Sequence, residues 1–154
     1  MGFSCYGISC VNPGFLAGKE LFFKQDKLTL RPYKYLMYSR QKRSKSETNF
    51  HHSVYVILLD PAAATHRSVI RLNPGCDPAK PCLYVGMTGL PVEERFRNHK
   101  NGLKSAWIVK RYGIRLLPEF YEYLNPMPYE AAAQMEKDLA ADLRAEGYTV
   151  TGGT

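Results

Sequence analysis

The first strong hydrophobic pattern along the chain is a continuous apolar run at residues 53–59, which ends at Asp60-Pro61. A short run rich in β-branched and aromatic side chains predicts a buried strand. A second run at residues 82–86 ends at a glycine and predicts another short strand. Residues 60–81 between the two runs are rich in Pro, Ala, Asn and Gly, and they predict a long loop.

Two helices and a strand are expected after the second run. Pro91 followed by two acidic residues is typical of a helix start and predicts a helix over residues 91–100. A second helix is expected over about residues 105–112, where Gly113 supplies the stop. A strand follows within residues 114–124, where a proline breaks or edges it.

The last helix, from Pro128 to Gly147, has the clearest helical pattern. Its apolar stripe repeats every fourth residue and consists of Met135, Leu139 and Leu143. A final short strand follows at residues 148–150. This order of elements predicts one small mixed α/β domain over residues 53–154, with a small, mostly antiparallel central sheet flanked by helices.

Residues 1–52 lack such periodicity and are interpreted as an appendage to this domain. The formal net charge is +7, and residues 1–50 hold nine Lys or Arg against three Asp or Glu, whereas the remaining residues hold twelve against eleven. A basic arm on a nearly neutral domain suggests a polyanionic partner, because Lys and Arg release counterions when they bind phosphates. The same composition also fits a solvated, partly disordered tail.

The composition disfavours membrane and zinc-binding proteins. No apolar run reaches the roughly 18 residues of a membrane span, and no signal peptide is visible, so we expect a cytoplasmic protein without membrane contact. The four cysteines are Cys5, Cys10, Cys76 and Cys82. They form no CxxC pair, and their spacing is not typical of a zinc site.

Polar residues suited to phosphodiester hydrolysis occur on several predicted elements. The two predicted strands carry Tyr55 and Tyr84. The following helix presents Arg95 and His99 four residues apart, on one face. Glu136 borders the apolar stripe of the last helix. A carboxylate can hold a divalent cation, a guanidinium can stabilise charge on a phosphate, and a phenol or imidazole can activate water.

In order and spacing these residues resemble the motifs of the GIY-YIG nuclease superfamily. Ser53-Val54-Tyr55 corresponds to the first tripeptide of that family, and Tyr84-Val85-Gly86 to the second. Arg95-Phe96-Arg97-Asn98-His99 is similar to the helix that carries the family's arginine. Pro128-Tyr129-Glu130, followed by Glu136, is similar to the segment that ends in the family's metal-binding glutamate.

The resemblance implies a divalent-metal-dependent endonuclease that hydrolyses phosphodiester bonds in nucleic acid, with DNA as the expected substrate. It implies that Glu136 binds one Mg²⁺ or Mn²⁺ and that Arg95 contacts the phosphate. Tyr55 or Tyr84 would position or deprotonate the attacking water. His99 would take part in proton transfer or phosphate contact.

Two more positions follow from this resemblance, which spans residues 53–153. Gly86, the glycine of the second tripeptide, is expected to lie against the substrate. Lys104 is expected to add a positive charge at the mouth of the site.

The chain departs from the family pattern in three places. Ser53 stands where the first tripeptide has glycine. Tyr55 and Tyr84 are 29 residues apart, whereas the family often joins these strands by a short hairpin. The C-terminal segment, residues 147–154, lacks the asparagine that family members often carry near the final strand.

From the residues alone, other interpretations stay open. The tyrosines could be core aromatics with one satisfied hydroxyl each. The arginine and histidine of the first helix could form a solvated face with Glu93 and Glu94, and Glu136 could pair with Lys137 or Arg144 on the surface. The alternative function is a nucleic-acid-binding module on the same fold without catalysis, and a domain for protein contacts is a third possibility.

Overall fold

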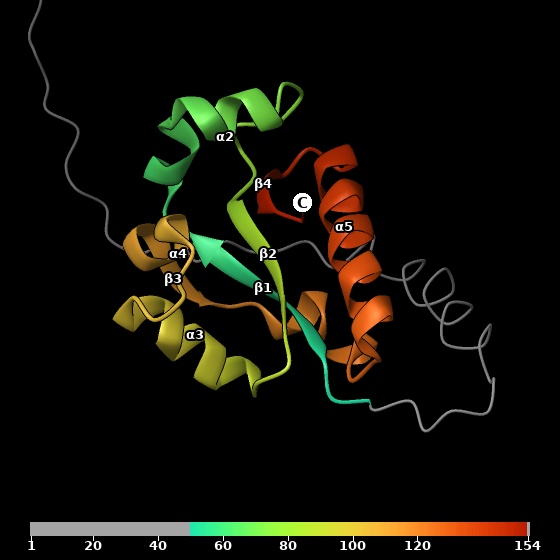
Figure 1. Ribbon diagram of the computed structural model, residues 1–154. Coiled ribbons are helices and arrows are strands. Elements are labelled where there is room, and N and C mark those ends of the chain that lie inside the picture. Colours follow the sequence, from blue (N-terminus) through green and yellow to red (C-terminus); the bar gives the residue numbers. More distant parts are fainter. Residues whose placement is uncertain (1–49, 154) are drawn as a thin grey trace, which may run out of the picture.

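A four-stranded sheet organises the domain, and the computed structural model describes residues 50–153. Its strands are β1 Ser53–Leu59, β2 Cys82–Thr88, β3 Gly113–Leu116 and β4 Thr149–Gly152, in the order β3-β1-β2-β4. β1 runs antiparallel to both neighbours, and β4 is parallel to β2 (Figure 1). The expected mixed α/β domain with a mostly antiparallel sheet is therefore confirmed. Residues 1–49 of the basic arm lie outside the described residues, and its last residue, His52, pairs with Met127.

Helices flank the sheet on two sides. The α-helices are α2 Arg67–Leu72, α3 Val92–Asn101, α4 Trp107–Tyr112 and α5 Tyr129–Ala145, and the short 3-10 helices are η2 Pro61–Thr65, η3 Pro118–Phe120 and η4 Glu122–Leu124. Figure 1 shows the sheet between α5 on one side and the α3–α4 pair on the other. Within the described part of the chain, no helix has the length and apolarity that a membrane crossing requires.

The helix predictions hold because their local signals are strong. Pro91 precedes the first turn of α3, and two acidic residues follow it at the positive end of the helix dipole. The apolar stripe of α5 is buried at Met135, Leu139 and Leu143. Gly147 has a φ of +89°, which an L residue rarely adopts, so it ends the helical segment at low steric cost.

The segment between β1 and β2 is more ordered than the long loop expected for residues 60–81. It contains η2 and α2, and the Asp60 side chain accepts a hydrogen bond from the Ala62 amide at 2.8 Å to start η2. Asn73 is buried behind α2 and binds both the amide and the carbonyl of Val150 on β4, at 2.8 and 3.0 Å. Because buried polar groups need partners, these two bonds clip the insertion to the edge of the sheet.

A second asparagine extends the sheet on its other side. The Asn125 side chain accepts a hydrogen bond from the Val54 amide at 2.9 Å and donates one to the Val54 carbonyl at 2.8 Å. These are the bonds that a neighbouring strand would make, and they lie beyond the end of the short β3. The segment before α5 is thereby fixed against the start of β1.

The register of β1 and β2 positions the candidate residues. Tyr55 lies opposite Gly86, and Ile57 lies opposite Tyr84. Opposed residues of an antiparallel pair point to the same face, so Tyr55 and Tyr84 are diagonal neighbours on one face of the sheet.

Candidate active site

A hydrogen bond between Tyr55 and His99 forms the centre of the candidate site. The Tyr55 hydroxyl lies 2.8 Å from His99 Nε2, and it joins β1 to the last turn of α3. Both side chains are almost fully buried, with exposed fractions of 1% and 0%. His99 is therefore not part of a solvated helix face, which was one of the alternatives that the sequence left open.

The backbone of Ala106 determines which nitrogen of His99 carries the proton. The Ala106 amide donates a hydrogen bond to His99 Nδ1 at 3.1 Å, so Nδ1 is an acceptor. A neutral imidazole has one donor and one acceptor nitrogen, and therefore Nε2 carries the proton and donates to Tyr55. Burial, with a smaller contribution from the charge of Arg95, lowers the pKa of His99 to about 4 and keeps the ring neutral at pH 7.

Tyr84 lies beside this pair and is only partly buried. Its ring centroid is 5.7 Å from that of His99 and 6.2 Å from that of Tyr55. Interaction between the two phenols lowers the pKa of Tyr84 and raises that of Tyr55. Tyr84 is therefore the more accessible member of a three-ring cluster whose buried part is the hydrogen bond between His99 and Tyr55.

Burial controls the protonation of both phenols. It is the largest cause that raises the pKa of Tyr55 and of Tyr84 above the ordinary value of a tyrosine. Arg95 acts in the opposite direction on each of them through its charge, and on Tyr55 also through a hydrogen bond. Arg95 is half-buried one turn before His99 on α3, so its guanidinium lies at the cluster as well as near the solvent.

Glu136 approaches the cluster from α5. Its Oε1 accepts a hydrogen bond from the Gly153 amide at 3.3 Å, just after β4. Burial raises its pKa, although the Gly153 bond and the charge of Lys137 partly offset this. The charge of Glu136 in turn raises the pKa of Tyr84, so the carboxylate lies within electrostatic reach of this phenol. The alternative pairing with Arg144 is not formed, because Arg144 donates to the carbonyls of β4 instead.

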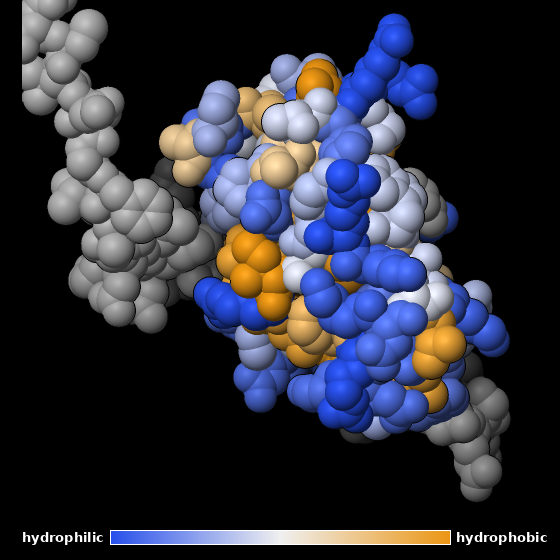
Figure 2. Space-filling view, turned by 90° about the vertical axis from the view of Figure 1, so that its left-hand side faces the viewer, coloured by the Kyte–Doolittle hydropathy of each residue, from blue (hydrophilic) through white to orange (hydrophobic). Residues whose placement is uncertain are grey.

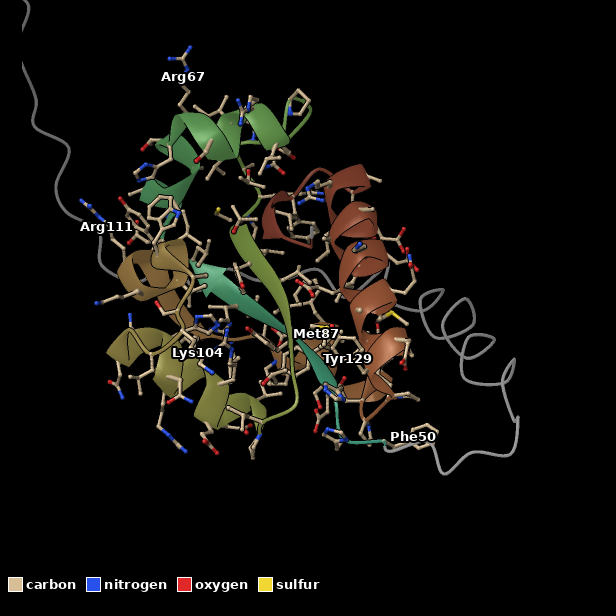
Figure 3. All side chains as sticks on the ribbon, in the orientation of Figure 1. Phe50, Arg67, Met87, Lys104, Arg111 and Tyr129 are labelled. Carbon is tan, nitrogen blue, oxygen red and sulfur yellow. The ribbon has the colours of Figure 1, made fainter. Side chains whose placement is uncertain are left out.

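The structure thus brings Tyr55, Tyr84, Arg95 and His99 together and places the Glu136 carboxylate within electrostatic reach of Tyr84. Gly86 and Lys104, the two residues expected to contact the substrate, do not lie at an open site beside this cluster. Gly86 is buried beneath the tyrosine rings, and Lys104 is exposed in the turn between α3 and α4 with a φ of 45° (Figure 3). No contact of Lys104 with the cluster is present in the described part of the chain.

The space above Gly86 is completely filled by the two tyrosines. A Cβ atom at this position would lie 2.7 Å from Tyr55 Cζ and 2.9 Å from Tyr84 Cε1. We expect Gly86→Ala to displace both rings, to lower the free energy of unfolding by about 1–3 kcal/mol as overpacked cores do, and to reduce any activity of the cluster. Urea unfolding and activity assays measure both effects. Gly75→Ala is the matched control, since nothing lies within 4 Å of its Cβ, and equal behaviour of the two variants would contradict this role of Gly86.

The lowered pKa of His99 makes stability depend on pH. Between pH 6.5 and about pH 4, His99 is protonated in the unfolded chain but stays neutral in the folded protein. The stability that is present above pH 6.5 is therefore lost as the pH falls. We expect the free energy of unfolding to drop by up to about 3 kcal/mol at pH 4, measured by urea unfolding. The raised pKa of Glu136 changes stability with pH in the opposite direction. The contribution of His99 is therefore isolated by comparing the wild type with His99→Asn. An equally steep loss in that variant would show that His99 is not its source.

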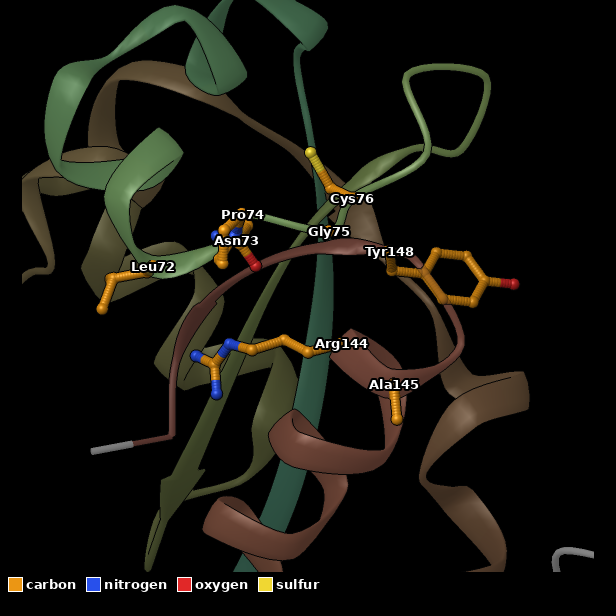
Figure 4. Close-up of a pocket in the computed structure, with 8 residues that line it drawn as sticks. All are labelled: Leu72, Asn73, Pro74, Gly75, Cys76, Arg144, Ala145 and Tyr148. Atoms are coloured by element: carbon orange, nitrogen blue, oxygen red, sulfur yellow. The ribbon is translucent and has the colours of Figure 1, made fainter.

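A surface pocket elsewhere in the domain offers no comparable chemistry. It has a volume of about 290 Å³ and lies between the end of α2 and the end of α5 (Figure 4). Its lining contains Asn73 and Arg144, whose hydrogen bonds to β4 are structural. None of the five clustered residues lines it.

Comparison with models of protein families, with curated proteins and with solved structures finds no match for this chain. The interpretation of the cluster therefore depends on its own geometry and on the motif resemblance of the sequence.

Proposed function

We propose that the domain is a divalent-metal-dependent endonuclease of the GIY-YIG type, which hydrolyses phosphodiester bonds in nucleic acid, with DNA as the expected substrate. The observation that supports it best is the buried hydrogen bond between His99 and Tyr55, with the accessible Tyr84 phenol in ring contact with both and the charge of Arg95 acting on all three. Core aromatics that serve packing alone do not need a buried neutral imidazole as a hydrogen-bond donor. Arrangements that shift several pKa values at one place are typical of functional sites.

The donor set fits a hard divalent cation. Magnesium is commonly held by one or two carboxylates, while water and substrate phosphates complete its octahedral shell. Glu136 supplies one half-buried carboxylate, and no group of three potential metal ligands occurs among the described residues. This set fits Mg²⁺ or Mn²⁺ and does not fit a structural zinc site, which would need four ligands. When bound, the cation would supply positive charge next to Glu136 and the scissile phosphate.

The roles of the side chains follow from their exposure. Tyr84 is the accessible phenol, so its hydroxyl positions the attacking water. It could take the proton of that water only as the phenolate, which the charges of Arg95 and of a bound cation would favour against the burial that raises its pKa. Tyr55 and His99 are buried behind Tyr84 and hydrogen-bonded to each other, so they hold the ring cluster in place, and interaction with the Tyr55 hydroxyl lowers the pKa of Tyr84. The expected part of His99 in proton transfer or phosphate contact changes accordingly, since His99 donates to Tyr55 and acts as a positioning residue.

Arg95 stabilises the substrate phosphate. The water oxygen forms a bond to phosphorus, the bond to the leaving oxygen breaks, and the leaving oxygen takes a proton from the solvent. Negative charge grows on the phosphate oxygens during this exchange, and the Arg95 guanidinium can donate two hydrogen bonds to them. Its charge also favours the phenolate form of Tyr84.

The alternative is a nucleic-acid-binding module on the same fold. The test is incubation of the full-length protein with plasmid, single-stranded DNA and RNA, with Mg²⁺, with Mn²⁺ or with EDTA. Cleavage that requires the metal and is lost in Tyr84→Phe supports the nuclease. Binding without cleavage in every metal condition would reject catalysis and favour the binding module.

A further inference from the structure

The charges of the domain are separated along the chain and in space. Residues 95–115, which form most of α3, all of α4 and most of β3, contain seven basic side chains and no acidic one. Residues 116–153 contain two basic and seven acidic side chains. The basic members that are exposed are Arg97, Lys100, Lys104, Lys110, Arg111 and Arg115. Figure 2 shows the α3–α4 side, and most of it is hydrophilic with a few apolar spots.

One of the exposed groups on this side is an aromatic ring. Trp107 begins α4, and 54% of its surface is exposed. Its ring makes T-shaped contacts with His66 at a centroid distance of 5.1 Å and with Tyr112 at 6.5 Å. His66 Nε2 and the Tyr112 hydroxyl are hydrogen-bonded at 2.7 Å, so the rings that support the indole are themselves fixed. The indole is held in place and yet open to the solvent.

The surroundings of Trp107 connect it to phosphate-binding groups and to the candidate site. Arg111 lies one turn further along α4, and Lys110 lies three residues along, so both can flank the indole. Figure 3 shows Arg111 extending from the domain on this side. The residue before Trp107 is Ala106, whose amide binds His99. Trp107 therefore directly follows the residue whose backbone amide orients His99.

We propose that Trp107 stacks on an unpaired base of single-stranded nucleic acid while Lys110 and Arg111 contact the phosphates on either side. An exposed ring with basic neighbours combines the two interactions that single strands offer, because every base has an aromatic face and every linkage has a charge. The bases of a duplex are covered on both faces and cannot use the ring in this way. A protein partner for this face would need acidic side chains, and it is an outcome of the test below. The inference rests on the proposed nuclease function and specifies its substrate.

The protein contains a single tryptophan, so its fluorescence reports on this position alone. Single-stranded oligonucleotides and blunt-ended, fully paired duplexes of equal length are titrated in EDTA, and fluorescence is recorded together with the anisotropy of a label on the nucleic acid. We expect quenching with single strands and little with duplexes. Trp107→Ala should weaken single-strand affinity about tenfold, and Trp107→Phe should retain most of it, since phenylalanine can still stack. Ile114→Ala, which removes an exposed apolar side chain from β3, is the matched control and should bind normally.

Three outcomes would overturn the inference: unchanged fluorescence at saturation of the anisotropy signal, equal quenching by duplexes, or normal single-strand affinity of Trp107→Ala. An apolar protein-docking role would give the third of these. Failure of the nuclease proposal would be seen separately, because quenching in EDTA with no cleavage in Mg²⁺ or Mn²⁺ would leave a single-strand-binding protein without catalysis.

Discussion

Replacing Arg95 by lysine is expected to lower the single-turnover rate of cleavage by about 100-fold or more, while the melting temperature and the affinity for nucleic acid stay near those of the wild type. Lysine keeps the charge but loses the planar pair of donors that matches phosphate oxygens. The loss appears in the rate because the phosphate gains charge in the transition state, and the size is that of a removed transition-state donor. Arg95→Ala should lose at least as much.

Arg97→Lys is the matched control for this experiment. Arg97 lies on the same helix and is exposed, so the same exchange should change the rate little. A single-turnover rate of Arg95→Lys close to that of the wild type would reject the catalytic role. Weaker binding of Arg95→Ala with an unchanged rate would instead support the binding module, because uniform binding affects affinity and not turnover.

The second large effect is expected at Glu136. Glu136→Gln keeps the shape of the side chain and an oxygen that can accept the Gly153 bond, but it removes the charge that would hold the cation. We expect metal-dependent cleavage to fall by about 1,000-fold or more, since several kcal/mol of charge stabilisation depend on the cation. The melting temperature should not fall, because burial already disfavours the ionised carboxylate.

Glu130→Gln, an exposed exchange of the same kind on α5, should cleave normally. Cleavage is measured over a series of Mg²⁺ and Mn²⁺ concentrations, so that weakened metal binding is distinguished from lost chemistry. Equal rates for Glu136→Gln and the wild type at every concentration would show that Glu136 is not the metal ligand. The role of Arg95 at the phosphate would then be tested only by the comparison of Arg95→Lys with Arg97→Lys.

The identity and secondary structure of the candidate site residues could be predicted from local sequence, whereas their burial could not. Tyr84 and Glu136 are predicted as site residues from motif and spacing, and the strand and the helix that carry them follow from local patterns. The burial of His99 is not predicted by the sequence of α3, which is mostly charged and polar, because it results from β1 and the α3–α4 turn covering the helix end. The exposed Trp107 was missed for the converse reason, since the lone tryptophan of a small domain is usually part of a core.

The long-range hydrogen bonds of two asparagines could not be predicted from the sequence either. Asn73 and Asn125 occur in segments that read as irregular, where asparagine is common and carries no special signal. Each of them binds backbone more than 70 residues away in sequence. The segment after β1 likewise contains η2 and α2, which are too short for their hydrophobic period to distinguish them from a loop.

By itself the sequence determines the order and type of the long elements and the mixed α/β class, because local periodicity and capping decide these features. The register that places Tyr55 and Tyr84 on one face is a property of the paired strands. Only the tertiary structure decides that His99 is neutral, which of its nitrogens donates, and which tyrosine is accessible. These properties depend on burial and on hydrogen bonds between residues distant in the chain, such as the 44 residues that separate Tyr55 from His99. A sequence pattern has no access to them, since burial and long-range partners exist only in the folded chain.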